Sequence, residues 1–230
     1  MKIKPDLSEV RKIAETGKYK TLPVSCEILS DILTPIEALK ILKNVSTHCY
    51  MLESVAEKEK WGRYTFLGFD PRLEITCIKG EMKAGGIEFK TEHPSGFLRQ
   101  ILSGYKSPRF DYLPSFTGGL VGYFSYDYLA YSEPSVRGDA ADTEAFRDVD
   151  LMLFDKVIAF DNFRQKIVLI VNMSLEEPET GYNKAVMELR QLVGLLKTGN
   201  DVSSGIETDC LKDKNKMAAF VAAVRKEESI

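Results

Sequence analysis

Apolar positions recur at a spacing of three or four residues in four parts of the chain, which predicts helices with one buried face. These parts are residues 7–17, 34–44, 93–105 and 182–199. The second part opens with Thr34, Pro35 and Glu37, which form a capping box with proline at the first helical position. Ser95 is the predicted cap of the third helix, and Gly199 marks the predicted end of the fourth.

Shorter runs that are rich in aromatic and β-branched residues predict strands. They cover residues 47–54, 63–69, 73–80, 86–91, 116–131, 150–160 and 166–173. Residues 81–86 and 161–165 have the composition of hairpin connections, and a hairpin pairs its two strands in antiparallel orientation. The order of these elements therefore predicts an α+β fold with an antiparallel or mixed sheet.

Composition excludes several classes of protein. The chain has 230 residues, of which 44% are hydrophobic, and this is enough for one large domain or two small ones. The net charge is −3 without a basic cluster, which argues against nucleic-acid binding. No apolar run reaches the roughly 18 residues of a membrane span, and the N-terminus lacks the apolar segment of a secretion signal. Four scattered cysteines fit a reduced, cytoplasmic protein, and the two histidines give no zinc or Ser-His-Asp pattern.

The C-terminal stretch suggests a domain boundary. Residues 199–212 have the polar, glycine-containing composition of a linker, and an amphipathic helix is predicted over 214–228. This helix either folds back on the preceding core or opens a further domain. We expect an N-terminal region over 1–198, a linker over 199–212 and the first helix of a further domain over 213–230.

A carboxylate and a hydroxyl close the predicted strand 47–54. Glu53 and Ser54 precede a charged loop that leads to Arg63. Together, their side chains can accept from and donate to an ammonium or amide group of a ligand, and a buried carboxylate would need such a partner. A solvated strand end fits the local pattern equally well, so the residues alone leave both interpretations open.

Three glycines interrupt the predicted strand 116–131. Gly118, Gly119 and Gly122 superficially resemble a dinucleotide-binding loop, but their spacing differs and an aromatic strand pattern follows them. We interpret them as positions where the backbone bulges or approaches a neighbour closely.

Three ordered motifs in this sequence resemble the anthranilate synthase component I family. They are MLES at 51–54 with GRYTFLGFDP at 62–71, and FTGGLVGYFSYD at 116–127. The run at 150–162 is similar to the family's strand ahead of its domain junction, so the resemblance extends over residues 20–175.

The resemblance implies antiparallel sheets packed face to face as a sandwich with flanking helices. It also implies an enzyme of tryptophan biosynthesis that condenses chorismate with ammonia from a glutamine amidotransferase subunit, releases pyruvate and requires Mg²⁺. The family's feedback inhibitor, L-tryptophan, binds beside the segment that matches MLES. Glu53 and Ser54 are therefore the candidate inhibitor-binding residues.

The family's residues for chorismate and Mg²⁺ lie in a second half that has no counterpart here. We therefore expect no catalytic residue and no metal ligand in this chain, no synthase activity from it alone, and weak or undetectable tryptophan binding. The helix over 213–230 resembles the opening of the family's catalytic domain. Exposed apolar strands at the divided β-core predict self-association.

Two alternatives remain open at this point. Component I of aminodeoxychorismate synthase, a relative in the folate pathway, has similar N-terminal motifs. A free-standing module that senses a ligand or docks a subunit is the alternative from a different class.

Overall fold

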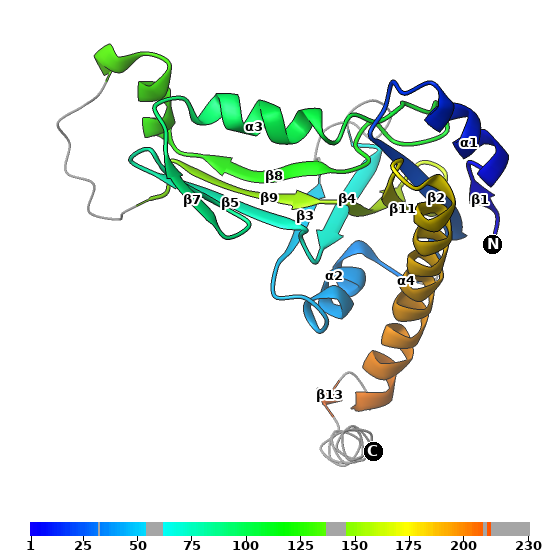
Figure 1. The fold of residues 1–230 in the computed structure, drawn as a ribbon. Helices are drawn as coiled ribbons and strands as arrows, with labels where there is room; N and C mark the ends of the chain where they lie inside the picture. Colours follow the sequence, from blue (N-terminus) through cyan, green and yellow to red (C-terminus); the bar gives the residue numbers. More distant parts are fainter. Residues whose placement is uncertain (32, 54–61, 137–145, 209–210, 213–230) are drawn as a thin grey trace, which may run out of the picture.

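Two antiparallel sheets and the helices that flank them make up the fold (Figure 1). The computed structural model describes residues 1–31, 33–53, 62–136, 146–208 and 211–212. The six-stranded sheet has the order β1 (Ile3–Lys4), β2 (Thr21–Leu29), β11 (Lys166–Ser174), β10 (Lys156–Asp161), β4 (Tyr64–Phe69) and β3 (Cys49–Glu53). The five-stranded sheet has the order β7 (Ile87–Lys90), β6 (Glu81–Ala84), β5 (Leu73–Ile78), β9 (Val149–Phe154) and β8 (Gly119–Phe124).

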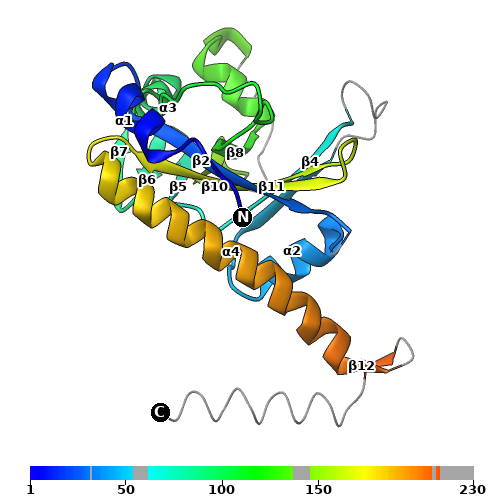
Figure 2. The ribbon, with the colours of Figure 1, turned by 90° about the vertical axis from the view of Figure 1, so that its right-hand side faces the viewer.

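The helices pack on the sheets through their apolar faces. They are α1 (Leu7–Glu15), α2 (Pro35–Lys43), α3 (Pro94–Ser103) and α4 (Pro178–Ile206), with 3-10 helices η1 (Tyr126–Tyr131) and η2 (Pro134–Val136). A two-residue pair, β12 (Glu207–Thr208) with β13 (Leu211–Lys212), follows α4. Figure 2 shows α4 and α2 side by side along the six-stranded sheet. The predicted α+β class with antiparallel sheets and flanking helices is confirmed.

Each sheet has its own hydrophobic core. Leu67, Ile158 and Leu169 of the six-stranded sheet share a fully buried cluster with residues of α1, α2 and α4. Ile75 of the five-stranded sheet belongs to a second cluster with Leu98 of α3. A third cluster covers the opposite face of the six-stranded sheet.

A two-stranded ribbon connects the sheets. The strand pair β10–β4 of one sheet continues into the pair β9–β5 of the other. Asp155 separates β9 from β10, and an ion pair between Lys156 Nζ and Asp70 Oδ2 (2.6 Å) bridges the ribbon where it leaves the six-stranded sheet. The single predicted strand over 150–160 is therefore two strands in two sheets, because the chain crosses between the sheets at Asp155.

Several local predictions are wrong in instructive ways. Residues 81–84 of the predicted hairpin connection form β6, since glycines on both sides of it allow two tight turns. Only residues 119–124 of the predicted strand 116–131 are extended, and η1 follows them. The strand β2 was not predicted, although it contributes more backbone pairing to β11 than any other strand.

The helix α4 continues to Ile206, although Gly199 predicted its end. A side chain at Gly199 would lie 2.7 Å from Ile41 of α2, so the glycine permits the two helices to approach closely inside a continuing helix. Residues 199–206, which were predicted to lie in a linker, are therefore helical. The proposed domain limits remain predictions, and residues 213–230 lie outside the described residues.

Candidate functional site

The predicted inhibitor-binding pair lies at the end of an edge strand. Glu53 is the last residue of β3 and is exposed, and its backbone is in register with Thr65 of β4. None of the hydrogen bonds or ion pairs found among the described residues involves the Glu53 side chain. Ser54 lies outside the described residues, so the arrangement of the pair stays a prediction.

The strand beside Glu53 is fixed by a buried ion pair. Arg63 donates through Nε to Asp161 Oδ1 (3.0 Å) and through the guanidinium NH2 to Asp161 Oδ2 (2.6 Å). Asp161 is 4% exposed and also accepts hydrogen bonds from the backbone N–H groups of Phe163 and Arg164. Burial raises the pKa of the Asp161 carboxyl, but these hydrogen bonds outweigh burial and lower the pKa below its usual value. The start of β4 is thereby attached to the turn between β10 and β11.

Two hydrogen bonds from Asn162 also anchor the start of β4. Thr65 is fully buried, and its hydroxyl accepts a hydrogen bond from the Asn162 side-chain amide (3.3 Å). The Asn162 backbone N–H donates to the Arg63 carbonyl at 2.9 Å. Because Glu53 pairs with Thr65, its backbone position is set by a strand that is anchored twice.

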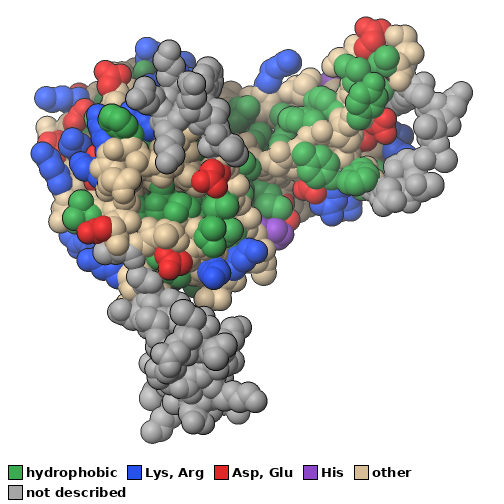
Figure 3. Space-filling model, turned by 180° about the vertical axis from the view of Figure 1, so that it is seen from behind, with side chains coloured by type: hydrophobic (Ala, Val, Ile, Leu, Met, Phe, Trp, Pro, Cys, Tyr) green, Lys and Arg blue, Asp and Glu red, His purple; other side chains and the backbone are tan. Residues whose placement is uncertain are grey.

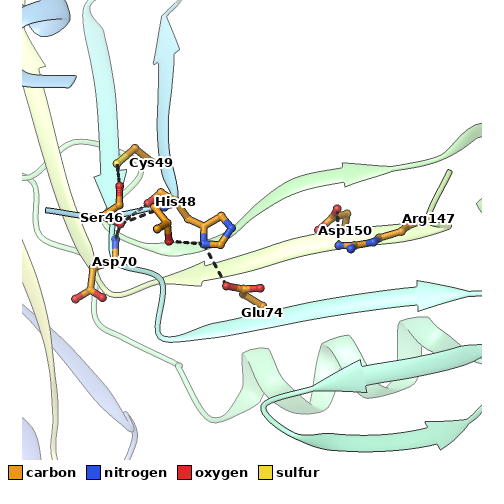
Figure 4. A network of polar contacts seen from close by, with 8 residues as sticks. Ser46, His48, Cys49, Asp70, Glu74, Arg147 and Asp150 are labelled. Atoms are coloured by element: carbon orange, nitrogen blue, oxygen red, sulfur yellow. Dashed lines mark hydrogen bonds and ion pairs between the residues drawn. The ribbon is translucent and has the colours of Figure 1, made fainter. Parts of the chain in front are cut away.

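The opposite end of β3 is held by a polar network (Figure 4). The Ser46 hydroxyl donates to the His48 carbonyl (2.8 Å) and accepts from the backbone N–H of Asp70 (2.9 Å). His48 Nδ1 lies 3.2 Å from Glu74 Oε1 on β5, and the thiol of Cys49 donates weakly to the Ser46 carbonyl. This network connects the beginning of β3 to the five-stranded sheet.

Tyr50 is the second residue of β3. Its ring covers Gly68 so closely that a side chain at position 68 would collide with it, and it contacts Phe154 edge-on with centroids 4.7 Å apart. The Tyr50 hydroxyl is buried without a hydrogen-bond partner among the described residues, and burial raises its pKa. Tyr50 therefore fills the junction between the two sheets.

The glycine motif has a structural role, as the interpretation of close backbone approach predicted. A side chain at Gly122 would overlap the Asp150 carbonyl, and one at Gly118 would lie 2.6 Å from the side-chain amide of Asn172. That amide donates to the carbonyls of Thr117 (2.6 Å) and Asp155 (3.0 Å). The motif thus joins the start of β8 to the ribbon between the sheets.

An exposed aromatic surface follows the glycine motif. Tyr123 and Phe124 of β8 are 41% and 50% exposed, and Tyr126 and Leu129 of η1 are 86% and 47% exposed. Figure 3 shows hydrophobic side chains gathered over the part of the molecule that contains the five-stranded sheet and η1. Gathered apolar surface of this kind commonly marks a contact with another protein surface.

Two kinds of site are absent from the described part of the chain. No three acidic, histidine or cysteine side chains there lie close enough together to hold a metal ion. None of the described helices has both the length and the apolar composition to cross a membrane.

Comparison with known proteins reveals relatives over most of the sequence. The chain is 35% identical over 193 residues to anthranilate synthase component 1 of Acinetobacter calcoaceticus, an alignment that covers 80% of this chain. It is 31% identical over 226 residues, or 96% of this chain, to anthranilate synthase component 1 of Pseudomonas aeruginosa. The resemblance of this chain to anthranilate synthase component I is confirmed. It spans 38% and 45% of the length of these two relatives.

A solved structure agrees with this resemblance. The crystal structure of anthranilate synthase component I from Streptococcus pneumoniae superposes on 74% of this chain with a TM-score of 0.51 and 26% sequence identity, and 36% of that protein is covered. No protein-family model matches the sequence.

Sequence reasoning missed the residues that hold the site in place. Arg63 lies within the GRYTFLG motif, but no role was predicted for it. Its partner Asp161 opens the connection 161–165, and an acidic residue at such a position is a turn signal rather than an ion-pair signal. Asn172 is a polar residue inside a strongly apolar strand, and this was the available sign of a buried hydrogen-bonding role.

Proposed function

We propose that this chain is the N-terminal part of an anthranilate synthase component I. The complete enzyme would convert chorismate and glutamine, or ammonia, to anthranilate, pyruvate and glutamate, together with a glutamine amidotransferase subunit in the cytoplasm. The observation that carries this proposal is the relation to proteins named anthranilate synthase component 1 over 80% and 96% of this chain. The order of the sequence motifs supports it.

We further propose that this portion supplies part of a feedback site for L-tryptophan. Glu53 would accept hydrogen bonds from the ammonium group of the amino acid, and Ser54 would contribute its hydroxyl. The support is the exposed carboxylate of Glu53 at the end of β3, next to a strand that Arg63 and Asn162 anchor. A hydrogen bond to a charged group contributes about 1.5–3 kcal/mol, so loss of the carboxylate should be measurable.

Chorismate and Mg²⁺ would be bound outside this portion. The chain spans less than half of the length of the relatives described above, and the described residues contain no metal-binding cluster. No catalytic step is therefore assigned to these residues. The aromatic surface of β8 and η1 supports association with a further protein surface, such as a second copy or the proposed partner subunit.

An activity assay tests the proposal. The full-length product of the gene that encodes this chain, supplied with chorismate, Mg²⁺ and ammonium ions, should form anthranilate, which is detected by its fluorescence. The isolated 230-residue chain should form none. Formation of aminodeoxychorismate in place of anthranilate by the full-length protein would contradict the proposed activity. Anthranilate formation by the isolated chain would contradict the proposal that chorismate and Mg²⁺ are bound outside this portion.

A binding measurement tests the incomplete feedback site. If two or three contacts of about 1–1.5 kcal/mol each come from the rest of the enzyme, the isolated chain binds tryptophan about thirty- to two-thousandfold more weakly than the whole enzyme. Calorimetry should therefore detect weak binding or none. Micromolar affinity of the isolated chain would show that the site is complete within it.

A further inference from the structure

A hollow opens on the six-stranded sheet where β1, β2 and β11 meet the segment after α3. It has a volume of about 170 Å³. Val168 in its wall belongs to the cluster on the face opposite α4, and Tyr112 and Leu113 form another part of the wall. Glu53 and the aromatic surface of β8 do not contribute to it, so the hollow is separate from the site proposed above.

The charged groups around the hollow favour an anion. Lys2 and Lys4 line it, and Lys4 Nζ lies 5.1 Å from the centre of the Tyr112 ring. Neither lysine takes part in an ion pair found among the described residues. The acidic residue in the lining, Glu27, is already paired with Lys166 Nζ at 2.6 Å. Two ammonium groups at the hollow are thus without a carboxylate partner among the described residues.

Tyr112 also lines the hollow. The Tyr112 hydroxyl is buried and has no hydrogen-bond partner in the described part of the chain. Burial, with a smaller contribution from Glu9, raises its pKa to about 12, so at neutral pH it keeps its proton and can donate. Buried polar groups in folded proteins nearly always have a partner, and an acceptor on a ligand would supply one here.

The remaining lining is apolar. Leu113 and Val168 offer hydrocarbon surface beside the lysines and the tyrosine. A cavity of about 150 Å³ accommodates benzene, so a volume of about 170 Å³ suits a small organic molecule better than a lone inorganic ion. We propose that this hollow binds a small organic carboxylate, with Lys2, Lys4 and the Tyr112 hydroxyl facing its anionic group and Leu113 and Val168 facing its carbon skeleton.

Titration of the 230-residue chain with benzoate tests this proposal, with benzamide as the neutral analogue of the same shape and inorganic phosphate as an anion without a carbon skeleton. Calorimetry gives the affinity, and amide NMR shifts locate the site. Benzoate should bind saturably and shift the amides of Tyr112 and Leu113, whereas benzamide and phosphate should bind at least tenfold more weakly.

Two variants and a matched control complete the test. Lys4→Met should weaken benzoate binding about tenfold, as expected for loss of one charge-assisted contact. Tyr112→Phe should weaken it at least threefold without lowering the melting temperature, because it removes a hydroxyl that has no partner. Lys18→Met is the control, since Lys18 also lies over a tyrosine ring, at 5.4 Å from the centre of Tyr19, but does not line the hollow.

Three results would overturn the proposal. They are the absence of saturable benzoate binding, equal losses in the Lys4 and Lys18 variants, and phosphate binding as tight as that of benzoate. Unchanged affinity in the Tyr112 variant would remove the hydroxyl from the site. None of these results bears on anthranilate formation, so the outcome is independent of the proposed function.

Discussion

Arg63→Met should destabilise the fold more than the loss of any exposed ion pair. The substitution keeps an aliphatic side chain but removes both hydrogen bonds to Asp161, which measure 3.0 and 2.6 Å. Removing one partner of a buried ion pair costs about 3–5 kcal/mol. Asp161 is 4% exposed but keeps two backbone donors, and Arg63 is 29% exposed. We therefore expect a smaller loss, of about 2–3 kcal/mol at neutral pH.

The measurement is urea unfolding followed by circular dichroism, with Lys166→Met as the control. The pair between Lys166 and Glu27 has the same shortest distance, 2.6 Å, but its side chains are 38% and 42% exposed. Exposed pairs contribute about 0–1 kcal/mol. A loss in Arg63→Met no larger than that in Lys166→Met would refute the reasoning.

The pH dependence gives a second check on the same pair. The folded-state pKa of Asp161 is lowered, so its stabilisation is fully present above the unfolded value of about 3.9 and is lost as the pH falls through the folded value. The difference between the wild type and Arg63→Met should therefore be largest near pH 7 and shrink below about pH 4. A difference that grows with acidity would contradict the assigned role of Arg63.

Three further substitutions test the packing around the ribbon. Gly122→Ala should destabilise by more than about 3 kcal/mol or prevent folding, since the methyl group would overlap the Asp150 carbonyl, whereas Gly96→Ala in open space on α3 should be neutral or stabilising in the same thermal melt. Tyr50→Phe should leave stability unchanged or raise it by about 1 kcal/mol in urea unfolding, because the lost hydroxyl has no partner among the described residues. Asn172→Ala should cost about 2 kcal/mol by loss of two hydrogen bonds to backbone carbonyls, and a loss below about 0.5 kcal/mol would contradict that role.

Local chemistry made part of the fold predictable. The capping box of α2 is present as predicted, with the Thr34 hydroxyl accepting from the Glu37 backbone and the Glu37 carboxylate accepting from the Thr34 backbone. The hairpin of β10 and β11 is also confirmed. Both features depend on residues close together in the sequence, so their signals are complete within a short window.

Contacts between distant residues were not predictable. The strand β2 contains Pro23, which normally argues against a sheet interior. Pro23 is tolerated because β1 pairs only with Ser25 and Cys26 and leaves Pro23 at an edge. The division of 150–160 at Asp155 depends on two sheets that no local pattern reveals.

In the candidate site, too, a local feature was predictable and the contacts between distant residues were not. The end of the apolar run correctly placed Glu53 at the end of a strand. The ion pair that fixes the neighbouring strand β4 could not be predicted, because Arg63 and Asp161 are 98 residues apart in the sequence.

Feedback inhibition of the full-length enzyme tests the central claim most directly. Anthranilate formation is measured against L-tryptophan concentration for the wild type, Glu53→Gln and Glu81→Gln, the last being an exposed strand carboxylate on β6. We predict that Glu53→Gln raises the tryptophan concentration for half-inhibition about tenfold or more, as expected for one lost charge-assisted contact. Its uninhibited rate, and the inhibition of Glu81→Gln, should match the wild type. Unaltered inhibition of Glu53→Gln would contradict the assignment of this strand end to the tryptophan site.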